Sequence, residues 1–211
     1  MLTLYVNVVD GVWFGVACEN ETVFATAFAF NRSQALQNLL INIPFNVPFQ
    51  QMEEPSEFAE KVVFSLADIY NGRGFAEKFS LATSWLSAYA QKVLKAVSSI
   101  PVGYVASYGS VARAAGGSPR AVGRVMSLNP FPLLVPCHRV VASDFTLGGY
   151  GAGLDVKLEI LKRERRGYNA MREIKVDNNI LQVFPVEFVL KSVNNANNNS
   201  LNPKCLRDIH G

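Results

Sequence analysis

Two short helical segments joined by a double glycine constrain the fold of this chain more than any other feature of its sequence. Ser107 is suited to cap a helix over residues 108–115, because a serine hydroxyl can accept a hydrogen bond from a backbone N–H of the first turn. Gly116-Gly117 then predicts a tight turn, and Ser118-Pro119 predicts the start of a second helix that ends near Ser127. This layout is typical of a helix-turn-helix, although the pattern alone favours an ordinary helical hairpin.

The region before these helices predicts a small α/β unit. Apolar, β-prone runs separated by turn signals predict three strands, over residues 2–9, 12–17 and 22–30. Ser33 and Ser56 are candidate caps for two helices that follow, and Asn71-Gly72 is suited to end the second of them. Pro44 and Pro48 favour a loop between the helices.

The region after residue 80 is predicted to be mostly helical. Ser87 is a candidate cap for a helix that Pro101 closes, and leucines 154, 158 and 161 mark a final amphipathic helix. Beyond Gly167 the signals weaken, with one or two strands expected within residues 180–190 and disorder expected over residues 194–202. We therefore expect an α/β domain over 1–79, a second domain over 80–167, and a partly disordered extension over 168–211.

Basic residues concentrate in the middle of the chain. Residues 1–90 carry four Lys/Arg against nine Asp/Glu, residues 91–175 carry thirteen against five, and residues 176–211 carry three of each. The net charge of +3 thus combines −5, +8 and 0. A basic segment of this kind is expected of a protein with a polyanion partner, but a well-solvated surface explains it equally well.

The composition is that of a globular protein, with 49% apolar and 18% charged residues. The apolar start of the chain is interrupted by Asn7 and Asp10 and lacks a preceding basic residue, unlike a secretory signal. No apolar run has the length needed to span a bilayer. We expect a cytoplasmic protein, or a nuclear one if the source is eukaryotic, with no membrane partner.

The cysteines are too few and too scattered for a disulfide framework. Cys18, Cys137 and Cys205 form no Cys-x-x-Cys pair, and the only histidines are His138 and His210. A zinc site from so few ligands is not expected, so no metal is predicted. Cys18 is interpreted as a core thiol and Cys205 as a thiol of the tail.

The neighbours of Cys137 distinguish it from an ordinary buried thiol. A reactive cysteine must form a thiolate, which needs a base or a positive environment, and His138 and Arg139 follow it directly. Adjacent side chains on a strand point to opposite faces, so Pro136 favours a turn in which a water could relay the proton. An acidic residue of the final helix, Glu159 or Glu164, could hold the imidazole in the required tautomer.

In this context the sequence resembles the O6-alkylguanine-DNA alkyltransferase (methylated-DNA–protein-cysteine methyltransferase) family. The resemblance covers about residues 80–167 and rests on five motifs in family order: Ile100-Pro101-x-Gly103, Ser107-Tyr108-Gly109, Arg120-Ala121-Val122-Gly123, Asn129-Pro130 and Pro136-Cys137-His138-Arg139-Val140. It implies a ribonuclease H-like N-terminal α/β domain and a mostly helical C-terminal domain with a helix-turn-helix. It also implies stoichiometric, irreversible transfer of an alkyl group from O6-alkylguanine in duplex DNA to Cys137.

The resemblance assigns the catalytic and substrate-binding residues one by one. Cys137 matches the acceptor, His138 the base that acts through water, and Glu164 the residue that orients it. Asn129 matches an asparagine that bonds the turn between the recognition helix and the active site. The substrate residues implied are Tyr108 at N3 of the flipped guanine, the carbonyls of Cys137 and Val140 at its amino group, the loop residues Tyr150 and Gly151, and Lys157 at a basic position of the pocket.

For DNA binding, the resemblance implies that Arg120 enters the duplex in place of the extruded nucleotide. Ala121 and Gly123 are small, which suits a helix lying close to a narrow minor groove. The full set of implied DNA contacts is Ser107, Arg120, Ala121, Gly123, Arg124 and Arg139. No cofactor is implied, because the alkylated base is itself the electrophile. The expected protein is a monomer that binds alkylated duplex DNA and is consumed in one turnover.

Some features depart from the family pattern, and other functions remain open. Val102 stands where the family often has tyrosine, Arg165-Arg166 lengthen the usual ending before Gly167, and the extension has no counterpart. A helix-turn-helix transcription factor would leave the Pro-Cys-His-Arg-Val motif unexplained. A cysteine hydrolase would need a distant histidine, and only His210 remains. The main alternative is a lesion-binding protein that recruits other repair factors, although that class lacks the acceptor cysteine.

Overall fold

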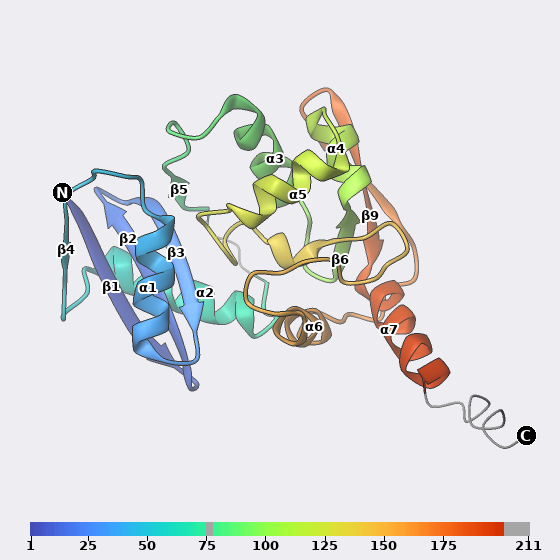
Figure 1. Ribbon diagram of the computed structural model, residues 1–211, viewed down its shortest axis with the longest axis horizontal. Helices are drawn as coiled ribbons and strands as arrows, with labels where there is room; N and C mark the ends of the chain where they lie inside the picture. The colour runs from blue at the N-terminus through green and yellow to red at the C-terminus, as the bar shows by residue number, and fades with distance from the viewer. Residues whose placement is uncertain (75–77, 201–211) are drawn as a thin grey trace, which may run out of the picture.

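The chain folds as a mixed α/β protein with two sheets, seen in a computed structural model that describes residues 1–74 and 78–200 (Figure 1). Cys205, His210 and residues 201–202 of the Asn-rich stretch lie outside the described residues. Within the described part, no helix is long and apolar enough to cross a membrane.

A five-stranded sheet forms the N-terminal part, in the order β4-β1-β2-β3-β5. Its core is an antiparallel meander of β1 (Leu2–Val9), β2 (Val12–Glu19) and β3 (Thr22–Ala29), as the sequence predicts. The short strands β4 (Phe49–Gln51) and β5 (Ser80–Leu81) pair in parallel with β1 and β3 at its edges. The loop predicted from Pro44 and Pro48 is therefore followed by a short strand, β4, that was not predicted.

Two helices cover the two faces of this sheet, because its strands alternate apolar residues between them. Helix α1 (Arg32–Asn42) packs its Leu39 on Leu4, and α2 (Glu57–Tyr70) packs in a separate cluster that includes Phe14. Ser56 caps α2 as predicted, accepting from the N–H of Ala59. The predicted cap of α1 is wrong by two residues.

The cap of α1 is Asn31, whose Oδ1 accepts from Gln34 N at 2.8 Å, and not Ser33. Asparagine is at least as good a cap as serine, and here it lies where the extended backbone of β3 ends.

The second region follows its predicted elements closely. Helix α3 (Ala88–Ser98) is capped by Ser87, α4 (Tyr108–Ala115) by Ser107, and α5 (Pro119–Ser127) by Ser118. Strand β6 (Tyr104–Ser107) leads into α4. A 3-10 turn, η1 (Cys137–Arg139), is followed by β7 (Val140–Val141), and α6 (Leu154–Arg163) is the final helix predicted for this region.

The extension forms ordered structure against this region. Strands β8 (Arg172–Val176) and β9 (Asn179–Pro185) make a hairpin, and β9 pairs antiparallel with β6 to complete a sheet in the order β7-β6-β9-β8. Helix α7 (Val186–Ser200) starts inside the segment expected to be strand and carries the Asn-rich stretch as far as Ser200. The extension therefore adds two strands to the sheet that contains β6 and β7.

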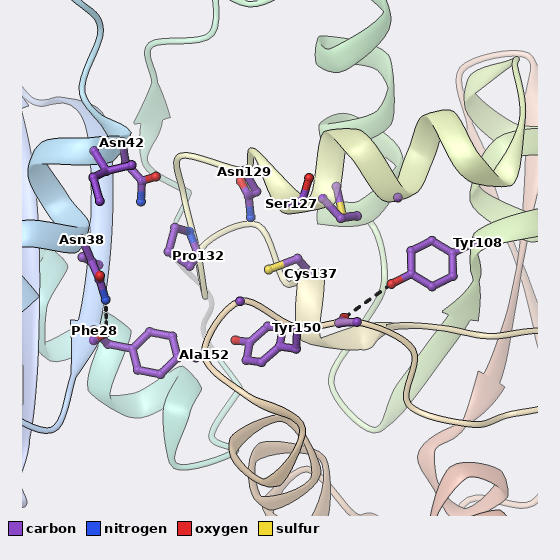
Figure 2. Close-up of a pocket in the computed structure, with 16 residues that line it drawn as sticks. Phe28, Asn38, Asn42, Tyr108, Ser127, Asn129, Pro132, Cys137, Tyr150 and Ala152 are labelled. Carbon is purple, nitrogen blue, oxygen red and sulfur yellow. Dashed lines mark hydrogen bonds between the residues drawn. The ribbon is translucent and has the colours of Figure 1, made fainter. Parts of the chain in front are cut away.

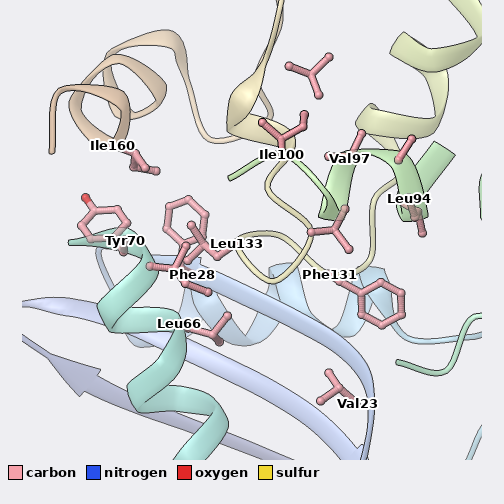
Figure 3. Packing of buried hydrophobic residues seen from close by; sticks show 14 of the residues in the cluster. Val23, Phe28, Leu66, Tyr70, Leu94, Val97, Ile100, Phe131, Leu133 and Ile160 are labelled. Atoms are coloured by element: carbon pink, nitrogen blue, oxygen red, sulfur yellow. The ribbon is translucent and has the colours of Figure 1, made fainter. Parts of the chain in front are cut away.

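One apolar core joins the parts of the molecule on either side of residue 80. Figure 3 shows Val23, Phe28, Leu66 and Tyr70 from the N-terminal part facing apolar side chains of the second, which include Leu94, Val97, Ile100, Phe131, Leu133 and Ile160. At the C-terminal end of α2, Gly72 adopts φ +73, and an added Cβ would lie 2.4 Å from the backbone of Arg163. Close backbone approach thus holds α2 against α6.

The extension buries a further small core, and this makes its contribution to stability measurable. Val189 of α7 is fully buried beside Val105, Val141 and Leu161. We expect Val189→Ala to lower the free energy of unfolding by about 2 kcal/mol, because it removes two buried methyl groups. Lys191→Ala, at an exposed position of the same helix, is the control and should change it by less than about 0.5 kcal/mol. Urea unfolding measures both, and equal values would mean that α7 does not belong to the folded core.

Candidate active site

Cys137 lies at the start of the 3-10 turn η1, which confirms the predicted turn after Pro136. The preceding loop is tied down by Asn129, which is buried. Its Nδ2 donates to Val135 O at 3.1 Å, and its Oδ1 accepts from Phe131 N at 3.0 Å. The side chain of Asn129 thus bonds the turn between α5 and Cys137, where the family resemblance predicts it.

The N-terminal part of the chain holds the same loop through one buried residue. Thr26 of β3 donates its N–H to Pro130 O at 2.9 Å and its hydroxyl to Pro132 O at 2.8 Å. Prolines have no N–H of their own, so these carbonyls are the groups by which the loop can be held. The strand β3 therefore positions the loop that leads to Cys137.

His138 and Glu164 form a fully buried pair. His138 Nε2 lies 3.0 Å from Glu164 Oε1. Burial alone would raise the pKa of Glu164, but the charges and hydrogen bonds of His138 and Arg139 outweigh it and lower this pKa to about 2. The carboxylate is therefore ionised and can only accept a hydrogen bond. The imidazole proton is therefore on Nε2, while Nδ1 is buried and has no partner among the described residues. Burial also lowers the pKa of His138, which keeps the ring neutral and able to take up a proton.

The thiol of Cys137 is protonated in the resting site. Burial raises its pKa, and the Asn129 amide, the charge of Lys157 and two backbone N–H groups only partly oppose this. A thiol of this kind reacts only when a base removes its proton. The neutral His138 next to it in the turn is a base of the required kind.

The loop after β7 is held against Tyr108 and Lys157. Gly148 adopts φ +65, and an added Cβ would lie 3.0 Å from the ring of Tyr108, so the loop can pack on this ring only with glycine there. The Tyr108 hydroxyl donates to Gly149 O at 3.5 Å. The ammonium of Lys157 donates to Val140 O at 2.6 Å and Leu147 O at 2.5 Å.

Cys137 opens into a cavity of about 530 Å³. Figure 2 shows its sulfur with Tyr108 on one side and Phe28, Asn38 and Asn42 of the N-terminal part on the other. Tyr150 also lines this cavity; its hydroxyl is buried and has no partner among the described residues. The cavity is lined by residues of α5 and of the loop 149–152, and its far wall comes from β3 and α1.

Most of the residues predicted for catalysis and substrate binding are brought together here. Cys137, Asn129, Tyr108, Tyr150 and Gly151 line the cavity. The carbonyls of Cys137 and Val140 each accept one hydrogen bond already, from Val140 N and from Lys157, which leaves each a second lone pair.

Three residues assigned to substrate or DNA contacts are buried instead. Arg139 donates through Nε and Nη2 to Glu164 and through Nη1 to Ile100 O at 2.6 Å, because a guanidinium this deeply buried must satisfy its donors inside the protein. The hydroxyl of Ser107 is occupied as the cap of α4. Lys157 is fully buried and does not line the cavity, because its ammonium holds the loop carbonyls.

The other implied DNA contacts lie together on α5. Arg120 and Arg124 are exposed, and their guanidinium groups make no hydrogen bond or ion pair with the described residues. Ala121 and Gly123 are half-buried on the same helix, and Gly123 lines the cavity. Helix α5 thus carries two exposed arginines, and its Gly123, Met126 and Ser127 line the cavity at Cys137.

Only some of the basic side chains in residues 91–175 are free to contact a partner at the surface. Arg163 lies over the ring of Tyr70 at 4.8 Å and donates to Asn71 Oδ1 at 3.2 Å, and Arg166 donates to Gly72 O. These arginines bind the end of α2 and so join the two parts of the chain. The charge count therefore overstates the basic surface.

Thr26 and Ile100 are parts of this site that were not predicted from the sequence. Thr26 carried no signal, since a threonine in a β-prone run looks like an ordinary strand residue. Gly148 had a weak signal, as the first residue of a glycine-rich loop. Among the described residues, no group of three or more His, Cys, Asp or Glu could hold a metal ion.

Comparisons with known proteins agree with this site. Residues 88–166 match the family model described as the 6-O-methylguanine DNA methyltransferase, DNA binding domain. A methylated-DNA–protein-cysteine methyltransferase of Methanothermobacter thermautotrophicus is 50% identical over 76 residues, which span 36% of this chain and 43% of that protein. The chain thus matches less than half the length of this curated relative. One from Thermococcus kodakarensis is 32% identical over 164 residues, 72% of this chain and 88% of that protein.

Solved structures agree over most of the chain. The O6-methylguanine-DNA methyltransferase of Pyrococcus kodakaraensis is 31% identical, with a TM-score of 0.58, over 78% of this chain and 99% of that one. The Mycobacterium tuberculosis OGT, solved in complex with DNA, shares the fold at 23% identity, with a TM-score of 0.60 over 77% of this chain and 92% of that one. The chain therefore belongs to the methylated-DNA–protein-cysteine methyltransferase family.

Proposed function

We propose that this protein repairs O6-alkylguanine in duplex DNA by moving the alkyl group irreversibly to Cys137. The observation that carries the proposal is a cysteine on the wall of a cavity of about 530 Å³, next in the chain to a neutral histidine that a buried carboxylate orients. The names of the relatives and the matched DNA-binding family model support the same activity.

The chemistry needs only residues of this chain and the damaged base. His138 takes the thiol proton of Cys137, through a water, and Glu164 stabilises the imidazolium that forms. The sulfur then attacks the carbon bonded to O6, an S–C bond forms, and the C–O6 bond breaks with its electron pair on the guanine. Burial raises the pKa of Tyr108, so its hydroxyl stays protonated and can donate to the guanine as negative charge develops there. The products are a thioether and a guanine in which one proton replaces the alkyl group, and this proton balances the one that His138 removed from the thiol.

The base must leave the duplex to reach Cys137, because the O6 carbon is inaccessible in a stacked helix. We assign helices α4 and α5 to a helix-turn-helix. We assign residues 1–79, which contain the N-terminal sheet, to a ribonuclease H-like domain, residues 80–167 to the DNA-binding and transfer domain, and residues 168–211 to the extension. In this arrangement α5 lies in the minor groove, with Ala121 and Gly123 allowing close approach and Arg120 filling the gap left by the flipped nucleotide. Arg124 contacts the phosphate backbone of the DNA. The protein acts as a monomer without a cofactor.

The proposal is tested by weighing the intact protein after incubation with a duplex that contains one O6-methylguanine. We expect a gain of one methyl group per molecule, found on the peptide that contains Cys137. Cys18→Ala is the matched control, since Cys18 is buried in β2, and it should gain the same mass. A protein that binds the duplex but gains no mass would be a lesion-binding protein instead.

Arg120 should matter for duplex DNA and not for the chemistry. If Arg120 stabilises the flipped state, Arg120→Ala should slow repair in a duplex about tenfold or more, since each ~1.4 kcal/mol lost is a tenfold smaller reactive population. Free O6-benzylguanine should react at the wild-type rate, and a lesion opposite an abasic site should recover part of the loss. Single-turnover rates measure all three.

Arg124→Ala is the control for a phosphate contact. It should weaken binding to all duplexes alike and lower the salt dependence of binding, without a separate loss in the rate of repair. Equal losses for Arg120→Ala on the free base and on the duplex would mean that Arg120 supports the fold, and the extrusion role would be withdrawn.

A further inference from the structure

The cavity at Cys137 extends beyond the space that the methyl group of a methylated guanine requires. An in-line displacement places the sulfur and O6 on opposite sides of the reacting carbon. The rest of the alkyl group must therefore extend away from the line that joins these two atoms. A methyl group has no such remainder and occupies about the space of one water, ~30 Å³. Yet the cavity of about 530 Å³ continues past Cys137 to residues of β3 and α1 (Figure 2).

This far part of the cavity has an apolar wall with two amides beside it. Ala27 and Phe28 of β3 are buried and line it together with Pro132. Asn38 and Asn42 of α1 also line it, and they lie on the same side of Cys137 as Phe28, opposite Tyr108 (Figure 2). None of the lining residues carries a charge.

The two amides are held in place by the protein. Asn38 donates to Phe28 O at 3.4 Å and accepts from Gln34 Nε2 at 2.8 Å. Asn42 donates to Thr26 O at 3.2 Å, and its own Oδ1 accepts no hydrogen bond from the described residues. Thr26 is the residue that holds the Cys137 loop, so the amide of Asn42 is fixed relative to the reacting sulfur. An oriented, unused acceptor beside an apolar surface is suited to a ligand that ends in a hydrogen-bond donor.

We propose that β3 and α1 form a distal subsite that receives the far end of long O6-substituents. Its ligand class is an uncharged substituent with an apolar body of several carbons and a terminal hydroxyl or amide, which bonds to Asn42. An anionic end group is disfavoured, because no cation lines the cavity to offset its desolvation. This inference rests on the proposed alkyl transfer and adds to it a preference among substrates, determined by the N-terminal part of the chain.

The test compares three duplexes that differ only in one guanine: O6-methyl, O6-hexyl and O6-(5-hydroxypentyl). The last two have substituents of equal length, with a hydroxyl in place of the terminal methyl. We expect the wild-type protein to transfer the hydroxypentyl group about three- to tenfold faster than the hexyl group, the range that one net hydrogen bond provides. Single-turnover rates by intact mass give this ratio without any mutation.

Asn42→Leu should bring that ratio close to one while O6-methyl transfer stays at the wild-type rate. Gln37→Leu is the matched control, because Gln37 is exposed on the same helix and does not line the cavity, and it should keep the wild-type ratio. Ala152→Leu provides a variant that does not risk the fold, since Ala152 is exposed and lines the cavity. It narrows the cavity, so it should slow transfer of both long substituents severalfold more than it slows methyl transfer.

The outcomes separate this inference from the proposed function. Methyl transfer with equal hexyl and hydroxypentyl rates in the wild type overturns the distal subsite and leaves the repair activity standing. A ratio that survives Asn42→Leu removes Asn42 as the acceptor and overturns the assignment. Equal slowing of all three substrates by Asn42→Leu means that Asn42 acts only through Thr26 on the fold. Absence of transfer from every duplex overturns the proposed function together with the subsite.

Discussion

Cys137→Ser is expected to abolish alkyl transfer while the protein still binds duplex DNA. A serine hydroxyl is far less acidic than a thiol, and the neutral His138 cannot produce an alkoxide nucleophile from it for attack on an alkyl carbon. The residues assigned to the duplex lie on α5, and the side chain of Cys137 faces the cavity. Binding should therefore be unchanged, and the loss should lie wholly in the reaction.

Two measurements separate these effects. Intact mass after incubation with an O6-methylguanine duplex should show no added methyl group, and a gel-shift titration should give the wild-type affinity. The same variant should also fail to react with free O6-benzylguanine, which needs no base flipping. A methyl gain in Cys137→Ser would show that another residue is the acceptor.

Glu164→Gln is expected to have the largest effect on stability. Its carboxylate accepts from Arg139 through Nε and Nη2 at 2.7 to 3.0 Å and pairs with His138, all inside the protein. A neutral amide leaves the buried guanidinium without its counter-charge, which typically costs about 3–5 kcal/mol. Alkyl transfer should also slow, because the imidazolium formed in the reaction loses its carboxylate. Urea unfolding and single-turnover kinetics measure the two losses.

Two controls identify the buried charge as the cause. Glu159→Gln removes a carboxylate from the same helix that pairs with Arg163 at the surface, and should cost less than about 1 kcal/mol. The double variant Glu164→Gln/Arg139→Met removes the unpaired charge and should regain much of the lost stability, without regaining the rate. A double variant no more stable than Glu164→Gln would contradict this account.

The buried pair of Glu164 and His138 makes the free energy of unfolding depend on pH. The folded pKa of Glu164, about 2, lies below its ordinary value of 4.5, so its contribution is complete above about pH 4.5 and is lost as the pH falls towards 2. The pKa of His138 is also lowered, from 6.5, so protonation of the unfolded chain adds a loss that begins below that pH. Stability should fall with decreasing pH in two stages, and the stage below pH 4.5 should be smaller in Glu164→Gln than in the wild type.

Local elements of this protein could be predicted from its sequence. The helix over 108–115 and the second helix that starts at Ser118-Pro119 were predicted with the bounds and caps that the structure has. These features are determined by neighbouring residues, because a cap, a proline and a glycine act within one turn of the chain. Cys137 and His138 could be recognised as a candidate nucleophile and base for the same reason, because they are adjacent in the sequence.

Contacts between distant parts of the chain were decided by the tertiary structure. Thr26 and Pro132 are 106 residues apart, and no local pattern pairs them. Glu159 and Glu164 were both candidates for orienting His138, and packing of α6 selected Glu164, 26 residues away. Arg139 was predicted to contact DNA and Lys157 to lie in the substrate pocket, because charge is read from the sequence without burial, whereas the fold gives each of them buried oxygen acceptors. The cavity beside Cys137 is likewise a property of packing, because α1 forms its far wall only after the two parts of the chain share one core.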